Sequence, residues 1–308
     1  MKSTSLIDII IPVYNRATVV GKTLRSIEMQ TVMPARVILV DNNSSDHTLH
    51  VLREWADKME RRGLTVKVLT ESKPGAASAR NRGLDESTAE YVMFFDSDDL
   101  MLPDHVESFA DRLASHPEAD VAGKSFMMTL PGGKRKTGYF HKHSHKFFNI
   151  FTGQFATLRY VARRSLLEKA GLWNPAISGW DDIELGQRML LLDPVITIVP
   201  GEPTVEVEVM PDSITESKFS TNPEKWERTL DEMRRTALEA RQPDLVNWID
   251  CRSMILAAEY SIERAESEAL RLRAKVLARN PNRRRLMLVY RYHRCFRRFT
   301  WLLCRVIF

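Results

Sequence analysis

The chain has 308 residues, of which 44% are hydrophobic and 28% charged, and this balance is typical of a globular protein with a substantial core. Cys251, Cys295 and Cys304 are its only cysteines; they lie late and lack zinc spacing, which favours a reducing compartment without structural disulfides. The first apolar run is interrupted by Asp8 and Pro12, so it is too short for a signal peptide or a membrane span. We therefore expect a cytoplasmic protein without a spanning helix.

The net charge of +5 is distributed unevenly along the chain. Residues 271–308 contain 11 Arg and one Lys but no acidic residue, which leaves a net charge of about −7 on the rest. The basic character of the sequence therefore belongs to its C-terminal tail.

The first hundred residues show regular alternation. Residues 6–13, 36–41, 64–69 and 91–95 are apolar runs of strand length, and helical patterns at 17–29, 49–59 and 76–84 separate them. This order predicts an α/β fold with a doubly wound, mostly parallel sheet. No G-x-G-x-x-G segment follows the first run, which counts against a dinucleotide-binding domain.

Beyond residue 103 the pattern is less regular. We expect a helix at 104–115, a strand at 120–129, a turn at Pro131-Gly132-Gly133, a helix at 163–170 and two short strands within 195–209. Met210-Pro211-Asp212-Ser213 marks a domain edge, and residues 226–278 have helical spacing. The sequence thus predicts a catalytic domain at 1–212 and a helical C-terminal extension at 213–308.

An acidic segment follows the fourth apolar run directly. Asp96, Asp98 and Asp99 come after Phe95, where the strand should reach the ligand-binding edge of the sheet. If the extended conformation continued, Asp96 and Asp98 would share a side and could hold Mg²⁺ or Mn²⁺ together with a diphosphate. The alternative, that these acids only form a turn before a helix, fits Asp99 well and Asp96 poorly.

A second acidic segment lies at Trp180-Asp181-Asp182, before a helical pattern. With Asp181 as the N-cap, Glu184 would complete a capping box, and Trp180 and Leu185 would form a hydrophobic staple. Asp182 has no such structural role and would be free to point into a cleft.

Three histidines alternate at His141, His143 and His145. On a strand their imidazoles would share one side, as a metal site requires, but the flanking Lys142 and Lys146 favour a solvated or acceptor-contacting loop. We therefore expect no metal at this run.

Five segments, in this order, resemble those of the family 2 inverting glycosyltransferases of the GT-A fold, the nucleotide-diphospho-sugar transferase type. The resemblance covers about the first 210 residues and is specific because it is an ordered set. The segments are Ile9-Ile10-Ile11-Pro12-Val13-Tyr14-Asn15, Val40-Asp41-Asn42-Asn43-Ser44-Ser45-Asp46, Gly75-Ala76-Ala77-Ser78-Ala79-Arg80-Asn81-Arg82-Gly83, Phe95-Asp96-Ser97-Asp98-Asp99 and Trp180-Asp181-Asp182.

The resemblance implies a nucleotide-diphosphate sugar donor, with a UDP-sugar favoured. Pro12 and Tyr14, with Asn15 beside them, would line the nucleoside pocket. Asp41 would bind the base, and Arg80 would lie near it.

The resemblance also assigns the acidic segments. Asp96, Ser97 and Asp98 would form the D-x-D motif that meets the donor, with Asp98 as the direct ligand of Mn²⁺ or Mg²⁺ and Asp96 beside it. Asp182 takes the place of the family's catalytic base, although the usual Glu-Asp pair is Asp181-Asp182 here. Many relatives have an Arg or His at the place of Val209-Met210-Pro211, so we assign no site residue there.

The chemistry needs one base and one cation, because a sugar hydroxyl is a poor nucleophile and a diphosphate leaves only when its charge is neutralised. Asp182 would take the acceptor proton in a single displacement that inverts the anomeric carbon. At a helix N-terminus its anionic form should be favoured, which makes it a weaker base. The alternatives are a nucleotidyltransferase, for which a basic glycine-rich triphosphate loop is lacking, and a non-catalytic nucleotide-sugar-binding module.

The pattern of the C-terminal tail indicates a binding surface. Residues 283–308 read as one amphipathic basic helix with an apolar face containing Leu288, Tyr292, Phe296, Phe299 and Leu303. Such a helix either docks on the protein or binds an anionic membrane surface. Because the rest of the chain has a net negative charge, we expect no binding of nucleic acid. With a saccharide or lipid-linked saccharide as acceptor, the enzyme would act in bacterial-type cell-surface polysaccharide or glycolipid assembly, peripherally at the inner face of the cell membrane.

Overall fold

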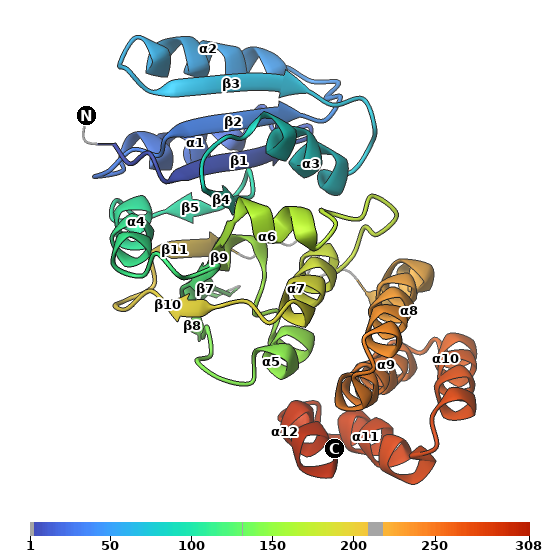
Figure 1. Cartoon of the computed structure of the whole chain (residues 1–308). Helices are drawn as coiled ribbons and strands as arrows, with labels where there is room; N and C mark the ends of the chain where they lie inside the picture. The colour runs from blue at the N-terminus through green and yellow to red at the C-terminus, as the bar shows by residue number, and fades with distance from the viewer. Residues whose placement is uncertain (1–2, 131, 209–217) are drawn as a thin grey trace.

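The computed structural model describes residues 3–130, 132–208 and 218–308. Its centre is a seven-stranded sheet with the order β10-β6-β9-β4-β1-β2-β3 (Figure 1). The pairs among β1 to β4 and the pair of β6 and β10 are parallel, and β9 runs antiparallel to both its neighbours. The strands are β1 (Ile7–Val13), β2 (Arg36–Asp41), β3 (Thr65–Thr70), β4 (Tyr91–Phe94), β6 (Val121–Gly123), β9 (Tyr160–Arg163) and β10 (Ile196–Ile198).

Helices cover both faces of this sheet, as the sequence predicts. Alternate residues of the apolar strands face opposite sides, so each strand contributes to two cores. On one side Ile9 and Ile11 pack with α1 (Val20–Glu28), α2 (Thr48–Glu60) and α4 (His105–Ser115). On the other, Ile10 packs with α3 (Ala76–Glu86), α6 (Arg164–Lys169) and α7 (Asp181–Leu191). The expected doubly wound, mostly parallel α/β fold is confirmed.

A smaller sheet lies beside the first, with the order β5-β11-β7-β8. It is made of β5 (Leu100–Met101), β7 (Phe126–Thr129), β8 (Arg135–Gly138) and β11 (Val205–Glu208). The strand expected at 120–129 is therefore two strands, because the chain leaves the large sheet after Gly123 and enters the small one at Phe126. Gly132 and Gly133, both with positive φ, belong to the turn between β7 and β8.

The C-terminal extension is a helical layer that shares a core with the sheet domain. It consists of η2 (Phe219–Thr221), α8 (Pro223–Glu239), α9 (Pro243–Ile262), α10 (Glu266–Arg279), α11 (Arg283–Phe296) and α12 (Thr300–Ile307). Its apolar core continues into Phe147 and Ile150 of α5 (His145–Thr152) and Ile183 of α7. Both helices lie on the side of the sheet domain that faces the extension (Figure 1). The domain edge predicted at Met210-Pro211-Asp212-Ser213 lies outside the described residues.

The expectation of one tail helix is wrong, because the chain turns at Arg297 and Phe299, whose φ angles are 50° and 61°. Two helices, α11 and α12, replace it, and α11 buries Leu286, Val289 and Tyr290 in the core of the extension. Within the described residues, no helix combines the length and apolarity needed to cross a membrane.

The positive charge of the tail is also partly compensated. Arg271, Lys275, Arg279 and Arg297 form ion pairs with acids that lie earlier in the chain, on α8 and α9. The twelve cations counted in residues 271–308 are therefore not all unpaired, because acids outside that segment bind some of them.

Candidate active site

The candidate site lies at the edge of the large sheet where β1, β2 and β4 end. Parallel strands end at the same edge, so the residues after Val13, Asp41 and Phe94 come together there, as the sequence predicts. The N-terminus of α7 carries the second acidic segment to this edge, where Asp181 forms an ion pair with Arg80 of α3.

Arg80 joins the two acidic segments. Its Nη2 donates to Asp96 Oδ1 and its Nη1 to Asp181 Oδ2, both at 2.9 Å. The guanidinium is buried and lies 4.3 Å from the ring centre of Trp173, whose backbone N–H and C=O are both bonded by the Asn81 side chain. The sequence predicts both acidic segments at one site but does not predict this link, which spans 101 residues from Arg80 to Asp181.

The first acidic segment is a turn and not an extended continuation of β4. The Asp99 N–H donates to the Asp96 carbonyl at 3.4 Å, so Asp96 and Asp98 do not share a side in the way a strand would place them. Asp96 Oδ2 accepts from Thr157 Oγ1 at 2.8 Å, and Ser97 is buried within the turn. The side chain of Asp98 is 52% exposed, with Arg16 Nη2 at 3.8 Å.

Negative charge accumulates in this turn. Burial and the charge of Asp96 raise the pKa of Asp98, and Arg16 only partly opposes them. Burial, Asp96 and Asp98 raise the pKa of Asp99 well above its usual range. A divalent cation would relieve this repulsion, and Mg²⁺ or Mn²⁺ commonly takes only one or two protein carboxylates beside water and phosphate oxygens. The exposed Asp98, with Asp96 next to it, therefore fits such an ion.

The loops after β1 and β2 are fastened to one another. The Asn15 backbone N–H donates to Ser44 Oγ at 3.0 Å, and Asn15 Oδ1 accepts from the Ser45 N–H at 2.9 Å. Asn15 has a φ of 49°, a conformation that asparagine tolerates better than most residues. Pro12 and the exposed Tyr14 flank this junction.

Asp41 offers an unused acceptor. Its carboxylate is buried, and Oδ2 accepts from the Ser44 N–H at 3.1 Å, whereas Oδ1 is buried without a partner among the described residues. An unpaired buried acceptor costs free energy, and a ligand N–H would remove that cost. This is the chemistry expected of a carboxylate that binds a nucleobase.

The capping assignment of the second segment is wrong. The residue before α7 is Trp180, in the left-handed region with a φ of 54°, and its side chain makes no capping hydrogen bond. Asp181 bonds Arg80 instead, and Glu184 pairs with Arg188. Trp180 and Leu185 pack into different cores and do not form a staple.

Asp182 is a stronger base than the helix N-terminus alone would make it. Its Oδ1 accepts from the Ile183 N–H at 2.8 Å, but burial and the neighbouring Asp181 outweigh that bond and raise the pKa of Asp182 to about 7. The prediction that its anionic form is favoured is therefore wrong. Burial, together with a like charge nearby, disfavours the ionised form of Asp182.

Several supporting residues carry no sequence signal of their own. Thr157 bonds Asp96, and Asn149 Nδ2 donates to the Ile183 carbonyl at 2.7 Å, tying α5 to the first turn of α7. Arg159 is buried and donates to the carbonyls of Thr152 and Gly153. Their pattern in the sequence is that of ordinary loop and helix residues, and only the tertiary structure brings them to the site.

Two histidines of the run at 141–145, His141 and His145, have partners within the protein. His141 stacks on Phe148 with ring centres 3.5 Å apart, and His145 begins α5 and bonds Gln154. Burial lowers the pKa of both imidazoles. Across the described ranges, no group of three or more His, Cys, Asp or Glu side chains is arranged to hold a metal ion.

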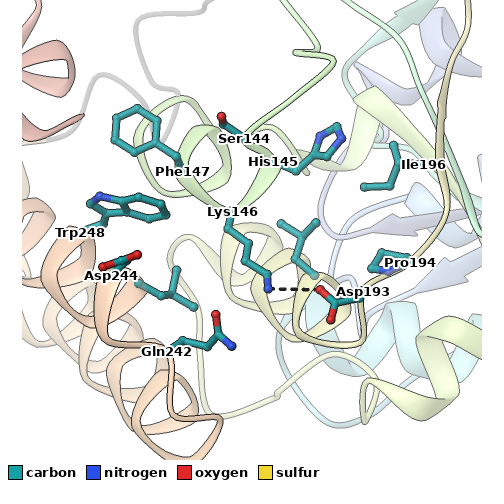
Figure 2. Close-up of a pocket in the computed structure, with 12 residues that line it drawn as sticks. Ser144, His145, Lys146, Phe147, Asp193, Pro194, Ile196, Gln242, Asp244 and Trp248 are labelled. Atoms are coloured by element: carbon teal, nitrogen blue, oxygen red, sulfur yellow. Dashed lines mark hydrogen bonds and ion pairs between the residues drawn. The ribbon is translucent and has the colours of Figure 1, made fainter. Parts of the chain in front are cut away.

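A cavity of about 410 Å³ lies at the opposite end of α7 from Asp182. It separates α5 from the first turn of α9, and the Lys146 amine points across it to Asp193 Oδ1 at 3.3 Å (Figure 2). Trp248 and Phe147 form one wall, with ring centres 5.2 Å apart (Figure 2). None of the acidic residues of the candidate site lines it.

Comparisons with known proteins agree with this architecture. The family model described as "Glycosyl transferase family 2" matches residues 8–167, more than half of the chain. The chain is 30% identical to the uncharacterized glycosyltransferase YibD of Escherichia coli K12 over 122 residues, 40% of this chain and 34% of YibD. It is 31% identical to glycosyltransferase GlyG of Streptococcus pneumoniae serotype 4 over 172 residues, 55% of this chain and 52% of GlyG.

Two solved structures share the fold over nearly the whole chain. The structure of S. aureus TarS 1–349 with UDP-GlcNAc has a TM-score of 0.67 at 18% identity and covers 98% of this chain and 90% of TarS 1–349. Mannosyltransferase PcManGT of Pyrobaculum calidifontis, in complex with GDP-Man and Mn²⁺, has a TM-score of 0.59 at 18% identity, covering 97% and 86%. These likenesses establish a glycosyltransferase fold of the GT-A type. Together with the family match, they show that the chain belongs to glycosyl transferase family 2. The chain matches about a third of the length of YibD and about half of the length of GlyG.

Proposed function

We propose that the protein transfers a sugar from a nucleotide-diphosphate sugar, with a UDP-sugar favoured, to an acceptor hydroxyl with inversion at the anomeric carbon. The observation that carries the proposal is the Arg80 bridge between Asp96 and Asp181. The bridge holds Asp96, from the acidic segment that would meet the donor, close to Asp181, the neighbour of Asp182. A diphosphate leaving group and a general base can then act on the same bound substrates.

Asp182 is the proposed base. With its pKa raised to about 7, its carboxylate accepts a proton more readily than an ordinary aspartate while remaining largely ionised above neutrality. It takes the proton of the acceptor hydroxyl as that oxygen attacks the face opposite the diphosphate, and a single displacement of this kind inverts the carbon. Asp181, fixed by Arg80, keeps the base strength high through its own negative charge.

On the donor side, Asp41 presents its unpaired Oδ1 to the nucleobase, and Tyr14 and Pro12 flank the nucleoside. Asp98, with Asp96 beside it, would hold Mn²⁺ or Mg²⁺, and the bound ion would neutralise charge on the leaving diphosphate. The TarS structures with UDP and UDP-GlcNAc and the PcManGT complex with GDP-Man and Mn²⁺ support a donor and an ion of these kinds.

The two alternatives fit less well. A nucleotidyltransferase would bind a triphosphate with a glycine-rich basic loop, whereas the loop after β1 is fastened to the next by Asn15. A module that only binds the donor would have no use for a carboxylate with a raised pKa at Asp182.

The extension supports a proposal about the acceptor. Phe296, Phe299 and Val306 of the tail are 65%, 59% and 83% exposed, and Arg291, Arg294 and Arg298 among them are exposed too. Exposed apolar side chains interspersed with arginines are typical of surfaces that bind anionic lipid. We therefore propose that the enzyme works at the inner face of the cell membrane on a saccharide or lipid-linked saccharide acceptor, in bacterial-type polysaccharide or glycolipid assembly.

Thermal unfolding with a panel of nucleotide sugars tests the donor assignment. A donor at 100 times its dissociation constant should stabilise the fold by about 2.7 kcal/mol in Mn²⁺, and EDTA should remove most of that gain. If no nucleotide sugar stabilises the protein, or nucleoside triphosphates do so instead, the proposed donor class is wrong.

A further inference from the structure

The residue directly before the second acidic segment is held by the helical extension. Trp180 has a φ of 54°, and its ring lies between groups from two helices of the extension. The Arg252 guanidinium of α9 is 4.5 Å from the Trp180 ring centre, and the ring of Trp226 on α8 is 4.8 Å away. Phe219 is next to both, with ring centres 5.7 Å from Trp180 and 5.2 Å from Trp226.

The backbone before Trp180 is fixed from the same side. Thr229 Oγ1 of α8 donates to the Gly179 carbonyl. A side chain at Gly179 would place its Cβ 2.8 Å from Lys225 and 2.9 Å from Trp226, so only glycine allows α8 to approach this closely. Helix α7 is also bonded one and a half turns further on, where Gln187 Nε2 donates to the Met233 carbonyl at 2.7 Å and to Thr236 Oγ1 at 2.8 Å.

Arg252 stacks on Trp180 and makes no other ring contact in the described part of the chain. It forms no ion pair or hydrogen bond there, and its Nε is buried without an acceptor. Burial lowers its pKa to about 10. Burying a cation in this way costs free energy, which the face of the Trp180 ring and the charge of Glu259 offset in part.

We propose that Trp180 and Arg252 are positioning residues, through which the helical extension fixes the first turn of α7 and hence the carboxylate of Asp182. The inference rests on the proposed role of Asp182 as the base. Trp180 is two residues from Asp182, so a shift of its ring moves the base relative to the acceptor oxygen without touching Asp98 or Asp41. A misplacement of about 1 Å at a reacting group can cost a hundredfold in rate.

The test compares steady-state transfer by the full-length wild type with that of Arg252→Met and Trp180→Ala, using UDP-sugar, Mn²⁺ and a saccharide acceptor. We expect kcat to fall between about tenfold and a hundredfold while the KM for donor stays within about twofold. The conservative variants Arg252→Lys and Trp180→Phe should recover most of the loss, because they restore a cation and a ring.

Two controls separate positioning from general destabilisation of the extension. Arg273 of α10 stacks on Tyr290 of α11 with its guanidinium 5.1 Å from the ring centre, so Arg273→Met and Tyr290→Leu remove a similar contact away from α7. They should lower the unfolding temperature without lowering kcat at a temperature where all variants are folded. Equal loss of kcat in the controls, or unchanged kcat in Arg252→Met and Trp180→Ala, would overturn the proposal. Full transfer by Asp182→Asn would instead show that the base assignment itself is wrong.

Discussion

At the scale of single residues, the two aspartates at the start of α7 have different roles that adjacent positions in the sequence conceal. Asp181 is bonded to Arg80, whereas Asp182 accepts a hydrogen bond from the Ile183 N–H and carries the raised pKa. The sequence predicts Asp182 as the base but assigns Asp181 to helix capping. That assignment fails because a buried arginine more than a hundred residues earlier in the chain competes for the carboxylate.

The rate of transfer should therefore depend on pH. Because a general base must be ionised, kcat/KM should rise as the pH increases through about 7, whereas a carboxylate near its ordinary value of 3.8 would give a flat profile there. Asp181→Asn removes the negative charge that helps to raise the pKa of Asp182, so the midpoint should move to lower pH. A pH–rate series on both proteins measures this; a midpoint that does not move would show that Asp181 does not influence the base.

At the scale of elements, the apolar runs of the sequence predict the strands correctly, whereas the break in the tail helix is not predicted. The four apolar runs up to Phe95 become β1 to β4, and the continuous runs of β1, β2 and β4 are buried on both faces of the sheet, whereas β3 is a partly exposed strand at its edge. The break at Arg297 and Phe299 has no such signal, since both residues are in a left-handed conformation that neither favours. The tail helix is therefore overestimated in length, and Leu286, Val289 and Tyr290, which α11 buries, are not among the residues of the apolar face that the sequence predicts.

The packing of α3 on the sheet gives a stability prediction. A Cβ at Gly83 would lie 2.4 Å from Ile10 Cγ2 in the middle of β1, so Gly83→Ala should destabilise the fold by about 1–3 kcal/mol. Gly21 on α1 has no atom within 4 Å of an added Cβ, and Gly21→Ala should gain up to about 1 kcal/mol from helix propensity. Urea unfolding of both variants checks the pair; equal effects of the same sign would contradict this packing.

At the scale of the whole molecule, the C-terminal extension shares a hydrophobic core with the sheet domain. Its core includes side chains of α5 and α7, and α11 buries Leu286 and Val289 in it. A truncation at residue 282 would therefore expose that core and would not test the tail cleanly.

Point variants are the better test of membrane binding. Phe296→Ser with Phe299→Ser should abolish sedimentation with vesicles of anionic lipid, while the wild type sediments with anionic and not with neutral vesicles. Leu238→Ser, at an exposed leucine of α8, is the matched control and should behave like wild type. Sedimentation that is indifferent to lipid charge, or unaffected by the double substitution, would show that the tail only docks on the extension.

Release of UDP from a UDP-sugar in the presence of acceptor is the measurement that most directly tests whether the two acidic segments form one active site. Wild type should release UDP with Mn²⁺ or Mg²⁺ and not in EDTA. Asp98→Ala should lose both turnover and metal-dependent donor binding, whereas Asp182→Asn should keep donor binding and lose turnover by about 10²- to 10⁴-fold. Turnover in EDTA, or wild-type turnover in either variant, would contradict a single reaction served by the two acidic segments.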